Sequence, residues 1–134
     1  LYAAMQMASA EGDEPVTVAG VAERVHIPPG ALAKVFRDLV RAGIAVGARG
    51  VGGGYRLARP AGEVTVLDVI SFFDPPRREG HSLLDDVGTP DCSDTPDCRL
   101  RRLFDEVDEM ARCTFASVTL ETLITPYHIR KSHA

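Results

Sequence analysis

Two amphipathic stretches separated by a short break dominate the first third of the chain. Between Val18 and Val25 the apolar residues fall on one face of a helix, and Thr17 precedes them as a plausible N-cap. The break at 26–30 contains two adjacent prolines, which suit only the first turn of a helix, so a second helix is expected to begin there. The pattern predicts a helix-turn-helix whose second apolar stripe contains Leu32, Val35, Phe36, Leu39 and Val40.

A glycine-rich run at 50–54 follows the second helix. Gly43 is placed to end that helix, the apolar run at 44–46 leads into an extended segment, and Tyr-Arg-Leu alternates at 55–57. Because glycine accepts positive φ, such a cluster between extended runs is typical of a tight hairpin turn. A P-loop is excluded because Gly53-Gly54 stand where Lys-Ser/Thr is needed, and a dinucleotide fingerprint because Tyr55 replaces its third glycine. We therefore expect a mainly α fold with a small β-hairpin, a winged helix-turn-helix.

The next segment combines a helix start with a long irregular stretch. Thr65 and Asp68 have the spacing of a capping box that opens a short helix, whose buried side is expected to contain Leu67, Ile70 and Phe73. From 77 to 97 the chain is rich in Gly, Pro, Asp, Ser and Thr, which predicts a long loop.

From about Arg99 the helical period returns and continues to Val118. About 20 residues at 1.5 Å each give a rod near 30 Å long, which is longer than a small winged helix needs. The stripe could pack against its own domain, but its length and its position after a loop favour a second copy of the chain. The expected dimer interface consists of Leu100, Leu103, Phe104, Val107, Met110, Ala111 and Val118.

The 134 residues are enough for one domain with an appendage, and 45% of them are hydrophobic. We expect a winged helix-turn-helix DNA-binding domain over 1–74, a cysteine-containing sensor loop over 75–98, a dimerisation helix with a short terminal helix over 99–124, and a tail over 125–134. The first eight residues already have helical character without a capping residue, so we expect further residues before Leu1.

Charge is distributed unevenly along the chain. The net charge of −4 argues by itself against nucleic-acid binding, yet the segment 24–59 contains seven Lys or Arg and only one acid, Asp38. A local basic patch supplies the phosphate-neutralising contribution that dominates DNA affinity. These charges could merely solvate a surface helix, but the adjoining glycine hairpin favours DNA binding. On the second helix the face opposite the apolar stripe contains Gly30, Ala31, Lys34, Arg37 and Arg41.

A family resemblance rests on the hairpin motif Arg-Gly-Val-Gly-Gly-Gly-Tyr at 49–55 together with the helix and strand residues around it. The run from Glu23 to Pro60 resembles the Rrf-two family of bacterial winged-helix transcription regulators, and the likeness continues through 64–70, the Cys92 to Cys98 region and 118–123. The resemblance implies that the start of the second helix and the hairpin, or wing, contact DNA.

The candidate DNA-binding residues differ in what they offer. Lys34 and Arg37 suit guanine edges or phosphates. Pro28, Gly30 and Ala31 stand where relatives often have hydroxyl or aromatic residues, so few direct hydrogen bonds to bases are available. The full candidate set is Pro28, Gly30, Ala31, Lys34, Arg37, Arg49, Val51, Gly52, Gly53 and Tyr55.

Three cysteines bear on a sensory role: Cys92 and Cys98 in the predicted loop and Cys113 in the long helix. The resemblance implies an iron-sulfur cluster in some relatives, but here Asp86 stands where a first cysteine falls and Arg101 replaces a histidine ligand. Three interpretations of the loop pair stay open: a cluster completed by other ligands, a thiol pair that oxidises to a disulfide, and a pair without a sensory role. A zinc site would need four ligands that the chain does not supply at standard spacing. Cys113 is expected to pack as a small hydrophobe.

These observations predict a homodimeric transcription regulator, a repressor, bound to a palindromic double-stranded operator. Its signal is expected to be redox state, iron-sulfur status or nitric oxide, read through Cys92 and Cys98; the alternative is a cluster-free regulator controlled by a small-molecule effector or a protein partner. No arrangement of a Ser-His-Asp, paired-carboxylate or metal-hydrolase type occurs at a usable spacing, so no enzyme is expected. Without a run of roughly 20 apolar residues or a signal peptide, we expect a cytoplasmic protein that does not contact a membrane.

Overall fold

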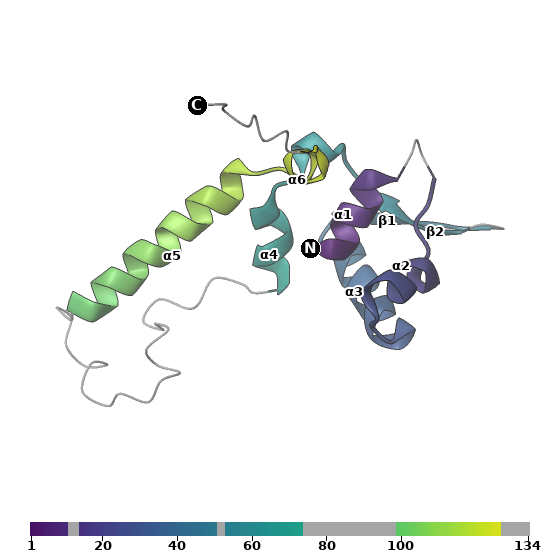
Figure 1. The fold of residues 1–134 in the computed structure, drawn as a ribbon, viewed down its shortest axis with the longest axis horizontal. Helices are drawn as coiled ribbons and strands as arrows, with labels where there is room; N and C mark the ends of the chain where they lie inside the picture. The colour runs from purple at the N-terminus through teal and green to yellow at the C-terminus, as the bar shows by residue number, and fades with distance from the viewer. Residues whose placement is uncertain (11–13, 51–52, 74–98, 127–134) are drawn as a thin grey trace, which may run out of the picture.

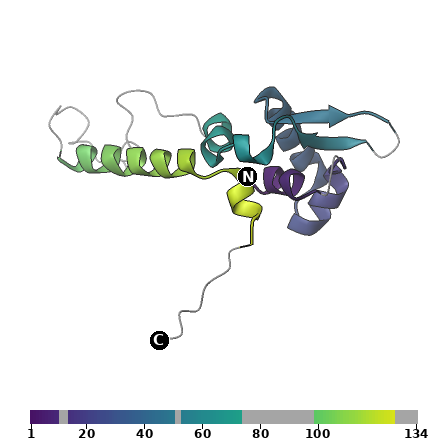
Figure 2. The same ribbon diagram turned by 90° about the horizontal axis from the view of Figure 1, so that it is seen from above.

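The computed structural model describes residues 1–10, 14–50, 53–73 and 99–126. A helical domain occupies the centre, and the hairpin and the long helix α5 extend from its opposite ends (Figures 1 and 2). The mainly α architecture with a small hairpin is confirmed. In chain order the elements are α1 (Tyr2–Ser9), α2 (Val18–Val25), α3 (Pro29–Arg41), β1 (Ala45–Ala48), β2 (Gly54–Leu57), the 3-10 helix η1 (Ala61–Glu63), α4 (Val66–Phe73), α5 (Arg99–Ser117) and α6 (Leu120–Ile124).

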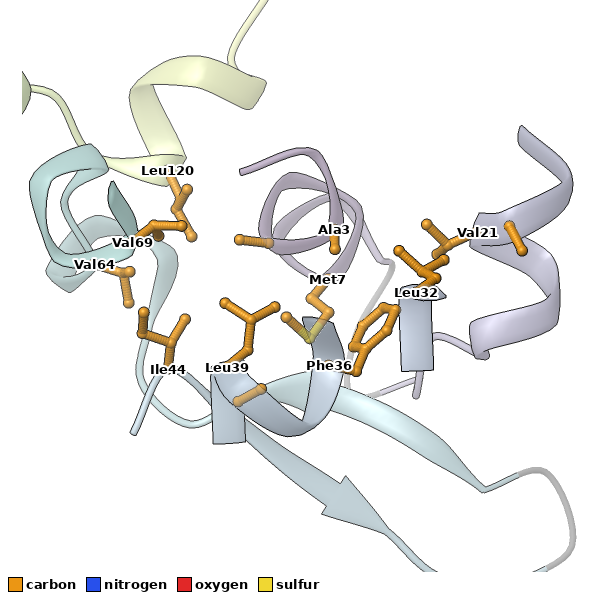
Figure 3. Close-up of a cluster of buried hydrophobic side chains, with 13 residues drawn as sticks. Ala3, Met7, Val21, Leu32, Phe36, Leu39, Ile44, Val64, Val69 and Leu120 are labelled. Atoms are coloured by element: carbon orange, nitrogen blue, oxygen red, sulfur yellow. The ribbon is translucent and has the colours of Figure 1, made fainter. Parts of the chain in front are cut away.

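One hydrophobic core joins the start of the chain to its C-terminal part (Figure 3). Phe36 and Leu39 of α3 are fully buried, and so is Leu120 of α6, the helix that follows α5 in the chain. Helix α6 packs against α1, so the segment after α5 lies next to the first helix of the chain. The core comprises Ala3, Ala4, Met7, Val21, Ala22, Leu32, Phe36, Leu39, Ile44, Ala45, Val64, Val69 and Leu120.

The predicted helix-turn-helix is confirmed together with its local signals. The Thr17 side chain accepts a hydrogen bond from the Gly20 N–H at 3.1 Å and caps α2. Helix α2 ends at His26, which adopts a left-handed conformation with φ 55°. Helix α3 begins at Pro29, where the missing N–H costs no intrahelical hydrogen bond.

A Schellman motif ends α3 and directs the chain into the hairpin. Gly43 has φ +71°, its N–H donates to Val40 O at 3.0 Å, and the Ile44 N–H donates to Leu39 O at 3.0 Å. Ile44 is 1% exposed, so the first residue after the turn is anchored in the core. The predicted role of Gly43 is therefore confirmed, and the position of β1 follows from it.

The hairpin is held to the domain by the segment that precedes α2. β1 and β2 pair antiparallel, with Ala48 opposite Gly54 at the wing end. Val16 then pairs with Tyr55 of β2: the Val16 N–H donates to Tyr55 O at 2.7 Å, and the Tyr55 N–H donates to Val16 O at 2.8 Å. A Cβ on Gly54 would lie 2.5 Å from Val16 O, so this close approach requires glycine.

The capping box at the start of α4 is confirmed, because the Thr65 N–H donates to Asp68 Oδ2 and the Asp68 N–H donates to Thr65 Oγ1, both at 3.0 Å. The predicted buried side is wrong for Phe73, whereas Leu67 and Ile70 are half-buried. Val66 and Val69 are the buried residues of α4, whereas Phe73 is 43% exposed. Phe73 shares the helical face of Val66 and Val69, but it is the last residue of α4, so its position at the helix end leaves it exposed.

The long helix is confirmed as α5, with 19 residues. The expectation for Cys113 is wrong: its side chain is exposed, and its Sγ lies 3.6 Å from Glu109 Oε1. The reason is geometric, since position 113 lies about 120° around the helix from Val107, outside the apolar stripe.

Substitution of Gly54 tests the close approach between β2 and Val16. Gly54→Ala should lower the free energy of unfolding by about 1–3 kcal/mol, because the new methyl group overlaps a backbone oxygen. Gly47→Ala is the matched control on β1, where a Cβ would meet no atom within 4 Å. Urea denaturation measures both changes, and equal stability of the two variants would contradict the packing described here.

Candidate nucleic-acid interface

Helix α3 presents a charged face on the side opposite its buried stripe. Lys34 and Arg37 are exposed, whereas Phe36 between them is fully buried. Arg41 at the end of the same face forms an ion pair with Asp38, with 3.4 Å between Nη1 and Oδ1. Lys34 and Arg37 lie nearer to the start of the helix than this ion pair does.

The N-terminal turn of α3 brings Pro28, Gly30 and Ala31 together at the exposed end of the helix, and all three are exposed. Helix-turn-helix proteins place this end of the second helix against base edges in the major groove. The structure thus brings five sequence-predicted residues to one surface, with the small ones at the tip and the cations, Lys34 and Arg37, behind them.

The wing turn contributes Arg49, which follows β1 directly and is exposed. Gly50 has φ +112°, and the Gly53 N–H donates to Gly50 O at 2.9 Å. A Cβ on Gly53 would lie 2.7 Å from Ala48 O. The turn that carries Arg49 therefore depends on glycine at two positions. The remaining wing residues expected to contact DNA, Val51 and Gly52, lie outside the described part of the chain.

Tyr55 connects the wing to α3. Its ring stacks on Phe36 with centroids 4.8 Å apart and an interplanar angle of 22°. Val16 holds its backbone from the other side. Such a contact between aromatic rings orients the wing relative to α3. The sequence pattern did not identify Val16 as a partner of the wing, because a single extended residue between a loop and a helix produces no periodicity.

Two further arginines of the basic segment are engaged within the protein. Arg24 donates from Nη1 to Gln6 Oε1 at 2.6 Å. Arg59 donates from Nη1 to Glu63 O at 3.2 Å and lies 3.7 Å from Asp68 Oδ2 through Nη2. The count of cations in the segment 24–59 therefore overstates what the α3 face and the wing offer to an anion.

Cys92 and Cys98, the proposed sensor pair, lie outside the described residues. Across residues 1–10, 14–50, 53–73 and 99–126, no group of three or more His, Cys, Asp or Glu is arranged to hold a metal ion. The third cysteine, Cys113, has Glu109 as its neighbour.

Helix α5 exposes one edge of its apolar stripe. Leu103, Val107 and Met110 are 53%, 49% and 70% exposed, whereas Phe104 and Ala111, on the other edge, are half-buried. Helix α5 packs against α4, which accounts for burial on one side only. Val118, just past the helix end, is half-buried, and the side chain of Leu100 lies outside the described set.

None of the described helices is both long and apolar enough to span a membrane.

Comparison with known proteins assigns this geometry to a family. A family model named Rrf2 (Rrf-two) and described as an iron-dependent transcriptional regulator matches residues 1–126. The chain is 34% identical over 124 residues to BadM of Rhodopseudomonas palustris, a protein named as an HTH-type transcriptional regulator, in an alignment that covers 92% of this chain and 75% of BadM. It is 32% identical over 110 residues to the HTH-type transcriptional regulator IscR of Xenorhabdus nematophila, covering 82% of this chain and 65% of that protein.

Solved structures agree on the fold. CymR, the global cysteine regulator of B. subtilis, is similar with a TM-score of 0.74 at 22% identity, over 94% of this chain and 90% of that chain. T. potens IscR is similar with a TM-score of 0.67 at 24% identity, over 91% of this chain and 77% of that chain. The exposed cationic face of α3, the glycine wing and these matches lead to one conclusion: the chain belongs to the Rrf2 family and is a DNA-binding transcriptional regulator with a winged helix-turn-helix fold.

Proposed function

We propose that this regulator represses transcription as a cytoplasmic homodimer that binds a palindromic operator, with α3 in the major groove and the wing beside it. The observation that carries this proposal is the exposure of Lys34, Arg37 and Arg49 on two elements that the stack of Tyr55 on Phe36 holds together. A rigid pair of elements presents these cations to the phosphates in one geometry. Gly53 shapes the wing turn, and Tyr55 contributes by orienting the wing.

The dimer in this proposal forms through the exposed edge of α5. Leu103, Val107 and Met110 follow one line along the helix, and large apolar side chains aligned in this way avoid water when a second copy covers them. A two-fold axis through α5 would present two α3 helices to two half-sites of one operator, which increases affinity through multivalency.

The signal in this proposal enters through Cys92 and Cys98. The family description as iron-dependent supports a use of these thiols that depends on iron or on redox state. Thiolates are the usual ligands of iron-sulfur clusters, and when bound such a group would supply an electron-transfer or ligand-exchange response. The same two thiols could instead form a disulfide, which needs no metal.

Removing the wing cation should weaken operator binding. Arg49→Ala should lower affinity at least about tenfold and reduce the slope of log K against log salt by about 1.8, because the dimer loses one phosphate contact in each half-site. Arg102→Ala is the matched control, since Arg102 is exposed on the far side of α5 from its apolar stripe. Fluorescence anisotropy at several salt concentrations measures both. An unchanged affinity and slope for Arg49→Ala would show that the wing does not contact DNA.

Placing a charge in the α5 stripe should dissociate the dimer. Val107→Glu should raise the dimer dissociation constant by at least about tenfold, because the interface would bury an unpaired carboxylate. Asp105→Asn, on the opposite side of α5, should leave the dimer intact. Sedimentation velocity measures the mass of each variant. A folded Val107→Glu protein that sediments like the wild type would rule out this interface.

Spectroscopy tests the cysteine pair. Anaerobically purified protein should absorb visible light and contain iron and sulfide, and Cys92→Ala and Cys98→Ala should both lose the absorbance and the iron. Cys113→Ala should retain both, since Cys113 lies on α5 beside Glu109. A colourless wild type without iron would contradict the cluster and leave thiol oxidation or a signal-free pair.

A further inference from the structure

The N-terminal tip of α3 exposes an apolar surface where a helix-turn-helix protein is expected to read bases. We call this surface the α3 tip. All of its residues are exposed, and none of their side chains can donate or accept a hydrogen bond. It consists of Ile27, Pro28, Pro29, Gly30 and Ala31.

The backbone of the α3 tip is nearly as apolar as its side chains. Pro28 and Pro29 have no N–H. The N–H groups of Ala31 and Leu32 both donate to Pro28 O, at 3.1 and 3.2 Å, and the Ile27 N–H donates to Ala22 O at 3.3 Å. Within the described structure, the Gly30 N–H is therefore the backbone donor that the tip retains, whereas most helices expose several N–H groups in their first turn.

The α3 tip is also open to close approach. A Cβ built on Gly30 would meet no atom within 4 Å, and Ile27 is 43% exposed and is not part of the core. The polar side chains that flank the tip in the chain are His26 before it and Lys34 one helical turn after it. A DNA surface that contacts the tip therefore meets methyl and methylene groups first.

The major groove offers one apolar feature that such a surface can recognise, the 5-methyl group of thymine, and alanine is one of the side chains that contact it. We propose that the α3 tip reads thymine 5-methyl groups by van der Waals contact, with Ala31 as the main specificity-determining residue, and that hydrogen-bond readout begins at Lys34. This inference rests on the DNA-binding function and adds what α3 recognises. It places a thymine in each half-site next to the base pair that Lys34 contacts.

Uracil substitution tests the inference directly, because deoxyuridine lacks only the 5-methyl group and pairs as thymine does. An operator is first selected from a random duplex library with the wild-type chain at fixed salt. Each thymine is then replaced singly by deoxyuridine, and affinity is measured by fluorescence anisotropy. At one or two positions per half-site we expect affinity to fall about three- to fivefold, the effect of losing one buried methyl group.

Two protein variants assign the effect to the α3 tip. In Ala31→Gly the ratio of thymine to uracil affinity at those positions should shrink to within about twofold, because the side chain that contacts the methyl group is gone. In Lys34→Ala the ratio should persist while affinity for both duplexes falls. Because uracil also alters base stacking, an effect that acted through DNA shape would persist in Ala31→Gly.

The possible outcomes distinguish thymine methyl recognition from DNA binding itself. Thymine and uracil operators of equal affinity at every position, or a ratio that Ala31→Gly leaves unchanged, would overturn methyl reading and leave DNA binding in place. Failure of the library selection to enrich any sequence would overturn specific DNA binding and the inference together.

Discussion

The stack of Tyr55 on Phe36 is the contact on which the proposed DNA-binding surface depends. A two-stranded hairpin alone is marginally stable in water, so the wing has to pack against the rest of the domain. Phe36, a fully buried residue of α3, provides the packing surface for the ring of Tyr55. Two hydrogen bonds with Val16 fix the backbone of Tyr55. Gly54 permits the close approach. The orientation of Arg49 relative to α3 therefore follows from the ring pair, the backbone bridge and the turn at Gly43 that positions β1.

A second constraint ties α5 to the base of the wing. Thr65 and Thr119 face each other in an isolated antiparallel bridge, and each caps the helix that follows it. Asp68, which completes the cap of α4, also pairs with Arg59 just beyond β2. The proposed dimer helix and the wing thus meet at one hydrogen-bonded junction.

Local signals in the sequence predicted most of the fold because they depend on neighbours within one turn. The capping threonine Thr17, the Pro28-Pro29 pair and Gly43 each marked a helix end that the structure confirms. These local signals did not predict which residues are buried where contacts with a distant segment matter. In α4 almost every residue is apolar, so the sequence pattern does not single out the buried residues, and the hydrogen bond from the Val66 N–H to Val118 O joins this helix to the segment after α5.

The sequence by itself determined the elements, their order, the winged helix-turn-helix and the apolar face of α5, because each follows from periodicity, capping and the special conformations of Gly and Pro. Only the tertiary structure decided which of the predicted basic residues have partners within the protein. Arg24 donates to Gln6, 18 residues away in the chain, and Arg59 pairs with Asp68 beyond the intervening η1. It also decided that Tyr55 faces Phe36. The reason is that a side chain's partner depends on contacts between distant segments, which no short window of sequence contains.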